Sequence, residues 1–278
     1  MDDTPKHRNE IRALEILSNR EHRSHIVQVL ATIVIENTPS RRSKLAILME
    51  LCDGTLGDHL GQKRRNVNDG HIPETDIFEI ITQILEGLEF CHSNQIIHRD
   101  LKPSNGRPLP MLKSDRSSLF DPEMSLPSSQ RVPFEVSSNG LWICKGKGIA
   151  DLSSRRWGTT CFRAPELMKD GKYSFSSDIW SIGCLIVDIV STGRRPAFRD
   201  DFHVIQLIST GWSESNRAVL HETDNPGLHP DIRTNLNKEI NWCFDLKPDR
   251  RPSAQELCKA FTEWRRNLLE HDQAMGVN

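Results

Sequence analysis

The 278-residue chain has no Cys-x-x-Cys pair, although it contains seven cysteines. The cysteines are scattered and odd in number, so the sequence indicates neither a disulfide framework nor a zinc site. Unpaired cysteines of this kind are typical of reduced thiols in an intracellular protein. We therefore expect the protein in the cytoplasm or the nucleus.

Long apolar runs and an excess of charge are also lacking. The start, MDDTPKHRNE, has no apolar core of a signal peptide. Runs such as CLIVDIV are far shorter than the roughly 20 residues that a membrane helix needs. The 36 basic and 38 acidic residues give a formal net charge of −2. The sequence therefore predicts no membrane span and no nucleic-acid partner.

Hydrophobic patterning near the amino end predicts a small β part. Residues 7–19 place apolar side chains at helical spacing, which indicates a short amphipathic helix. The runs HIVQVLATIVIE and KLAILMEL are rich in β-branched or apolar residues and are joined by a polar stretch. Together they predict an antiparallel strand pair.

The rest of the chain is predicted to be mainly helical. Residues 72–92 carry Pro73 near the first turn and then one apolar stripe, which predicts a long amphipathic helix. The stretch SDIWSIGCLIVDIVSTG is apolar on nearly every side and is typical of a buried helix. Three or four further helical segments are predicted over residues 200–266.

Residues 106–135 differ in composition from both neighbours. Five prolines stand among many serines in this range, and such a stretch cannot hold a helix. A loop of this length without structure of its own is usually regulatory or an insertion. We expect a disordered insertion here.

Four motifs occur in a fixed order, and together they identify a family resemblance. They are HRDLKPSN at 98–105, GTTCFRAPE at 158–166, SDIWSIG at 177–183 and DRRPSAQEL at 249–257. In this order the chain resembles a eukaryotic protein kinase of the Ser/Thr type, from roughly Arg8 to Arg266. The resemblance implies an α+β, bilobal fold with an incomplete small β lobe and a mainly helical large lobe.

The resemblance also implies a division of the chain. Residues 1–52 would form the remnant of the small lobe and the hinge, and residues 53–105 the start of the large lobe with its catalytic loop. The insertion at 106–135 would interrupt the large lobe, which continues over 136–266. Residues 267–278 would form a tail.

The implied activity is ATP-dependent transfer of a phosphoryl group to Ser or Thr hydroxyls of protein substrates, with ATP and Mg2+ as cofactors. Phosphoryl transfer depends mainly on position and charge, so it requires a carboxylate, a cation and metal ligands. In the resemblance Asp100 accepts the proton of the substrate hydroxyl. Lys102 reaches the transferring phosphate, and Asn105 holds a magnesium ion.

Further residues have supporting roles by the same resemblance. Arg99, which follows His98 in the motif, would pair with a phosphorylated activation segment. Thr159 would form a hydrogen bond near Asp100 and Lys102. Glu166 and Arg251 would form a buried ion pair, and Asp178 would hold the catalytic loop from beneath.

The nucleotide-binding half is less complete in the sequence. Met49 would be the gatekeeper, and the backbones of Glu50 and Cys52 would bond adenine. Glu10 would be the glutamate that pairs with a lysine from an earlier strand. Only nine residues precede Glu10, so we expect this chain to lack the glycine-rich loop and that lysine.

The magnesium-binding Asp-Phe-Gly motif has two possible positions. In the first, Asp151 is the metal ligand, with Leu152 and Ser153 in place of Phe and Gly. In the second, NGLWIC is the preceding strand, the motif is lost near Lys145 and Gly146, and Asp151 is a solvated acid. Both alternatives remain open at this point.

These departures lead to two functional hypotheses. The first is a Ser/Thr protein kinase whose activity is impaired in this chain. It is favoured by the complete set Asp100, Lys102 and Asn105. The second is a pseudokinase that acts as a protein-binding or scaffold module. It is favoured by the incomplete nucleotide-binding half.

Overall fold

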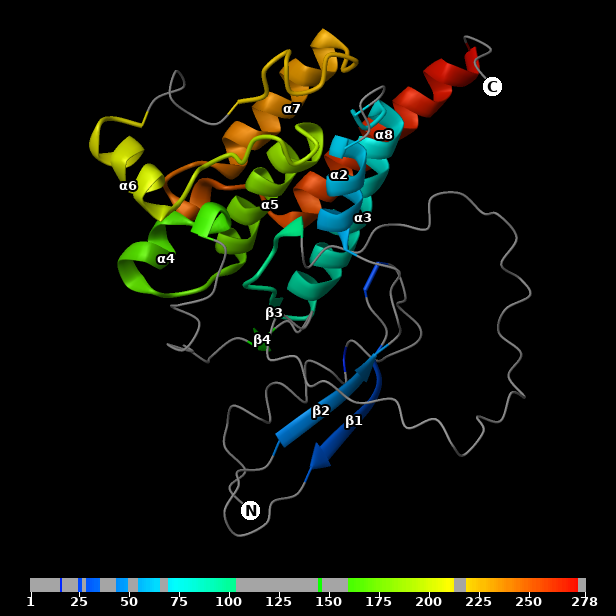
Figure 1. The fold of residues 1–278 in the computed structure, drawn as a ribbon. Helices are drawn as coiled ribbons and strands as arrows, with labels where there is room; N and C mark the ends of the chain where they lie inside the picture. Colours follow the sequence, from blue (N-terminus) through cyan, green and yellow to red (C-terminus); the bar gives the residue numbers. More distant parts are fainter. Residues whose placement is uncertain are drawn as a thin grey trace, which may run out of the picture.

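The structure is a computed structural model. It describes residues 16, 25–26, 29–35, 44–49, 55–65, 70–103, 145–146, 160–212 and 219–274. Figure 1 shows an α+β arrangement in which the helices gather in one body. The predicted fold class is therefore confirmed for the part of the chain that is described.

Two short antiparallel strand pairs make up the described β structure. Strand β1 (Val29–Ile35) pairs with β2 (Lys44–Met49), with a bulge near the start of β1. This pair confirms the predicted strand pair, and it lies below the helices in Figure 1. Strand β3 (Ile96–Ile97) pairs with β4 (Lys145–Gly146). The residues just before His98 therefore lie beside a segment that is distant in sequence.

The predicted helix at 7–19 falls mainly outside the described residues. Within that range only Ile16 is described, and it is helical. It packs against a small cluster formed by Cys91 and Ile96.

Helix α2 (Leu56–Arg65) and helix α3 (Glu74–Ser93) follow the strand pair. Pro73 occupies the position before α3, where a missing backbone N–H costs nothing. The buried stripe of α3 includes Ile77, Ile81 and Leu85, as its spacing predicts. This face packs on helix α8 (Ala254–Ala274), where the ring of Phe78 lies 5.9 Å from that of Phe261.

Helix α5 (Phe175–Val190) forms the centre of the helical body (Figure 1). It begins with a capping box in which the Ser174 hydroxyl accepts the Ser177 N–H. Twelve of its 16 residues are buried, which confirms the predicted buried helix. Trp180 stacks on Phe198 at a ring distance of 5.3 Å.

The remaining described elements surround α5. A 3-10 turn, η4 (Thr160–Phe162), leads into the short helix α4 (Pro165–Asp170). Helices α6 (Asp201–Ser209) and α7 (Pro230–Cys243), the turn η6 (Pro248–Arg250) and α8 complete the body. In the described part of 200–266, the α-helices are α6, α7 and α8, which agrees with the three or four predicted segments.

Candidate functional site

The candidate site is the loop that follows β3, at residues 98–102. Asp178, in the first turn of α5, holds the backbone of this loop. Asp178 is only 1% exposed. One carboxylate oxygen, Oδ2, accepts the His98 N–H at 2.7 Å, and Oδ1 accepts the Arg99 N–H at 2.8 Å. Hydrogen bonds to a charged acceptor are roughly twice as strong as neutral ones. Asp178 therefore determines the path of the loop.

Arg99 adopts a backbone conformation that needs such support. Its φ angle is 74°, in the left-handed region that residues other than glycine rarely occupy. A strained residue persists only where its surroundings hold it. The two hydrogen bonds from the loop backbone to Asp178 provide part of that restraint.

A third partner of Asp178 was missed by the sequence reasoning. His92, in the last turn of α3, places Nε2 2.9 Å from Oδ2 of Asp178. Its ring lies 4.8 Å from the ring of Phe175. The two residues are 86 positions apart, so no local pattern pointed to their contact.

His98 is buried within the loop and is 6% exposed. Burial lowers its pKa, whereas the nearby carboxylates of Asp178 and Asp100 act in the opposite direction. A lowered pKa favours the neutral imidazole. In that form Nδ1 accepts the Asp100 N–H at 3.3 Å, which ties the loop to its own side chain.

Asp100 and Lys102 form an ion pair on the outer side of this loop. The Lys102 Nζ lies 2.9 Å from Oδ2 of Asp100. The Lys102 side chain is 14% exposed and the Asp100 side chain 42% exposed. Leu101 between them is buried and anchors the loop in the core. The arrangement presents an accessible carboxylate beside a fixed cation.

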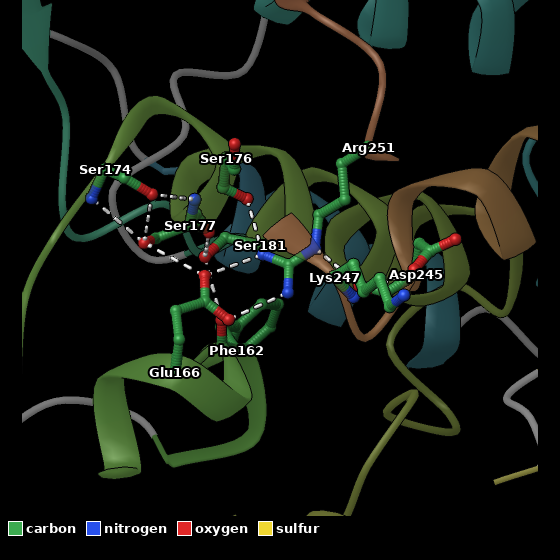
Figure 2. Close-up of polar contacts among 9 residues, drawn as sticks. All are labelled: Phe162, Glu166, Ser174, Ser176, Ser177, Ser181, Asp245, Lys247 and Arg251. Carbon is green, nitrogen blue, oxygen red and sulfur yellow. Dashed lines mark hydrogen bonds and ion pairs between the residues drawn. The ribbon is translucent and has the colours of Figure 1, made fainter. Parts of the chain in front are cut away.

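A second polar cluster links the segment after η4 to α5 and η6 (Figure 2). Arg251 donates two hydrogen bonds to the two carboxylate oxygens of Glu166, at 2.7 and 2.8 Å. It also donates to the carbonyl oxygens of Ser176 and Asp245, each at 2.8 Å. Its side chain is fully buried, and its guanidinium lies over the Trp180 ring at 5.1 Å.

Serine hydroxyls tie the same segment to the start of α5 (Figure 2). The Ser177 hydroxyl donates to Glu166 at 3.2 Å, and the Ser181 hydroxyl donates to the Phe162 carbonyl at 2.8 Å. The helix that carries Asp178 is therefore joined both to the candidate loop and to the 160–166 segment.

The other predicted site residues lie at the edge of the described part or outside it. Met49 is the last residue of β2, and only its backbone is described. The predicted site residues that lie outside the described part are Glu10, Glu50, Cys52, Asn105, Asp151 and Thr159.

Within the described ranges, no group of three or more His, Cys, Asp or Glu residues is arranged to hold a metal ion. No described helix combines the length and the apolar character needed to cross a membrane.

Comparisons with known proteins agree on one family. The family model described as "Protein kinase domain" matches residues 2–106 and 145–261. Mitogen-activated protein kinase kinase kinase 3 of Arabidopsis thaliana is 30% identical over 251 residues, which cover 88% of this chain and 31% of that protein. Mitogen-activated protein kinase kinase kinase 2 of the same plant is 27% identical over 250 residues, covering 88% of this chain and 32% of that protein.

A mammalian relative gives a similar result. Mitogen-activated protein kinase kinase kinase 1 of Rattus norvegicus is 26% identical over 219 residues, covering 78% of this chain and 13% of that protein. The chain thus spans less than a third of the length of these curated relatives.

Proposed function

The chain belongs to the eukaryotic Ser/Thr protein kinase family, and we propose that it transfers the γ-phosphoryl group of ATP to Ser or Thr hydroxyls of proteins. One observation carries the proposal: the Asp100 and Lys102 ion pair at 2.9 Å, on a loop whose backbone is fixed by Asp178. Catalysis of this reaction rests on positioning and electrostatic stabilisation. A buried anchor beneath an accessible acid and a fixed cation supplies both.

Each loop residue has a role in this proposal. Asp100, the more exposed partner, accepts the proton of the attacking hydroxyl as a general base. Lys102 donates hydrogen bonds from Nζ to the phosphoryl group in transfer and offsets the charge that develops there. Its mostly buried side chain keeps Nζ close to Asp100, so the base and the cation act on the same site.

The family generally binds ATP and Mg2+, and the residues available suit both. Mg2+ prefers oxygen ligands, which the Asn105 amide and the Asp151 carboxylate offer. When bound, Mg2+ offsets the charge of the ATP phosphates. We propose that Met49, Glu50 and Cys52 line the adenine site.

The supporting residues complete the proposal. Asp178 and His98 shape the loop, and the Glu166 and Arg251 pair braces the segment after η4 against α5 and η6. We assign Arg99 to a phosphorylated activation segment, as the resemblance implies. We assign Thr159 to a hydrogen bond near Asp100 and Lys102, as the resemblance implies.

We propose that the activity of this chain is low. Asp151 is followed by Leu152 and Ser153 rather than Phe and Gly, and the family match leaves out residues 107–144. Loss of one preorganised electrostatic contact typically costs about 10²–10³ in rate. A weakened metal ligand would therefore reduce the rate without abolishing it.

A second candidate function is a pseudokinase that binds other proteins. The same departure from Asp-Phe-Gly favours it, because a protein-binding module does not need a metal ligand. Three exposed apolar side chains on α6, Phe202, Ile205 and Ile208, also suit a binding surface.

A thermal-shift titration with ATP and Mg2+ separates the two functions. At 100 times the dissociation constant, a ligand stabilises the folded state by about 2.7 kcal/mol, which raises Tm by about 5–10 °C. A rise that is smaller in the Asn105→Ala variant supports the kinase. A folded chain with no rise at millimolar ATP contradicts it and favours the scaffold.

A further inference from the structure

The chain contains a single tyrosine, Tyr173, and its ring lies against the candidate loop. The guanidinium carbon of Arg99 is 5.4 Å from the centroid of this ring. A cation is attracted to the face of an aromatic ring within about 6 Å, and arginine forms most such contacts. Arg99 directly precedes Asp100, so the ring acts on the residue next to the proposed base.

The position of the ring is set by the chain around it. Helix α4 ends at Gly171, whose φ of 66° makes the sharp turn that glycine allows, and its N–H donates to the Leu167 carbonyl at 3.1 Å. Ser174, the residue after Tyr173, is the capping residue of α5. Tyr173 is therefore held between two anchored helix ends.

The same segment grips Arg99 at two points. Asp178, five residues after Tyr173, accepts the Arg99 backbone N–H at 2.8 Å, and the Tyr173 ring packs on the guanidinium at the other end of the side chain. The φ of 74° at Arg99 is strained and needs such restraint. Together the two contacts fix both the backbone and the side-chain direction of Arg99.

We propose that Tyr173 is a positioning residue for the phosphoryl-transfer loop. It holds Arg99 through the face of its ring, and through Arg99 it keeps Asp100 and Lys102 in place. This inference rests on the proposed function. Misplacement of a reacting group by 1 Å can cost about 10²-fold in rate, so loss of the ring affects the chemical step more than ATP binding.

A double-mutant cycle in Tm tests the contact without any activity measurement. Tyr173→Leu keeps an apolar side chain but removes the ring, and Arg99→Met removes the cation. We expect Tyr173→Leu to lower Tm by about 2–4 °C in the natural chain and by less than about 1 °C in the Arg99→Met background. Tyr173→Phe keeps the ring face and should leave Tm within about 1 °C.

Kinetics test the consequence for the reaction. We expect Tyr173→Leu to lower kcat about tenfold and to leave KM for ATP within about twofold, whereas Tyr173→Phe retains most of the activity. Gln255→Leu is the control, because Gln255 is exposed on α8 and its replacement should change neither Tm nor kcat.

Three results would overturn the proposal: the same Tm loss for Tyr173→Leu with and without Arg99, an unchanged kcat, or a Tyr173→Phe variant as impaired as Tyr173→Leu. If the natural chain transfers no phosphate, the proposed function fails. The coupling in Tm alone then decides whether Tyr173 holds Arg99.

Discussion

Removal of the Glu166 carboxylate should strongly destabilise the fold. Arg251 is held by two hydrogen bonds to Glu166 and by the carbonyl oxygens of Ser176 and Asp245, with its side chain fully buried. In a Glu166→Ala variant the guanidinium keeps its charge and loses its counter-ion. Among the described residues, no other carboxylate forms a hydrogen bond to this guanidinium.

The expected size follows from this burial. Breaking a buried ion pair by removing one partner typically costs about 3–5 kcal/mol. For a domain of this size, each 1 kcal/mol shifts Tm by about 2–4 °C, so we expect a fall of about 6–20 °C. The carbonyl oxygens of Ser176 and Asp245 keep part of the guanidinium satisfied, which favours the lower part of that range.

Urea unfolding followed by circular dichroism measures the cost. The variants are Glu166→Ala, Arg251→Met and the double variant, with Glu222→Ala as the control at an exposed acid. Because the two partners share their contacts, the double variant should lose at least about 1 kcal/mol less than the two single losses added. The control should stay within about 0.5 kcal/mol of the natural chain.

Either of two results would refute this reasoning. One is a Glu166→Ala cost as small as that of Glu222→Ala, which would mean that the pair is solvated. The other is full additivity of the two single variants, which would mean that Glu166 and Arg251 do not interact in solution.

Two further predictions concern α5. Gly183→Ala should destabilise the fold by about 1–3 kcal/mol in urea unfolding, because an added Cβ would lie 2.7 Å from the Phe244 ring; an unchanged midpoint would contradict this packing. Burial raises the pKa of Asp188 to about 6, so the folded state binds a proton more tightly than the unfolded one. The free energy of unfolding should therefore fall as pH rises from about 4 to about 6. Asp188→Asn should raise this free energy by about 1–3 kcal/mol at pH 8 and by less at pH 5. An equal gain at both pH values would contradict the raised pKa.

The sequence predicted best those elements whose pattern is formed by residues close together in the chain. The stripe through Ile77, Ile81 and Leu85 needs only helical spacing to indicate α3, and the apolar surface of α5 indicates its burial. The strand pair of β1 and β2 follows from two β-branched runs and a polar connection. In each case the residues that form the element are neighbours in the chain.

Contacts between distant segments could be expected only through the family resemblance. Glu166 and Arg251 are 85 positions apart, and only the order of the four motifs suggested that they meet. Neither the contact of His92 with Asp178 nor that of Tyr173 with Arg99 has a sequence signal in one chain, because each depends on how α3, α5 and the loop pack. The spacing of residues along the chain predicts single helices and strands, but not the contacts that form when these elements pack together.

The position of the metal-binding aspartate shows the same limit. Strand β4 directly follows NGLWIC. It pairs with β3, the strand that directly precedes the candidate loop. Asp151 itself lies outside the described residues, so its assignment stays a prediction. Asn105 also lies outside the described residues, and its role as a metal ligand stays a prediction.

The most direct test of the account is phosphoryl transfer from labelled ATP to a Ser- and Thr-containing protein, measured for the 278-residue chain and its Asp100→Asn variant. Asparagine keeps the size of the side chain but cannot accept a proton, and general-base catalysis typically contributes about 10²–10⁴ in rate. We predict slow but measurable transfer by the natural chain and a loss of that size in the variant. Equal rates for the two proteins would contradict the assignment of the loop.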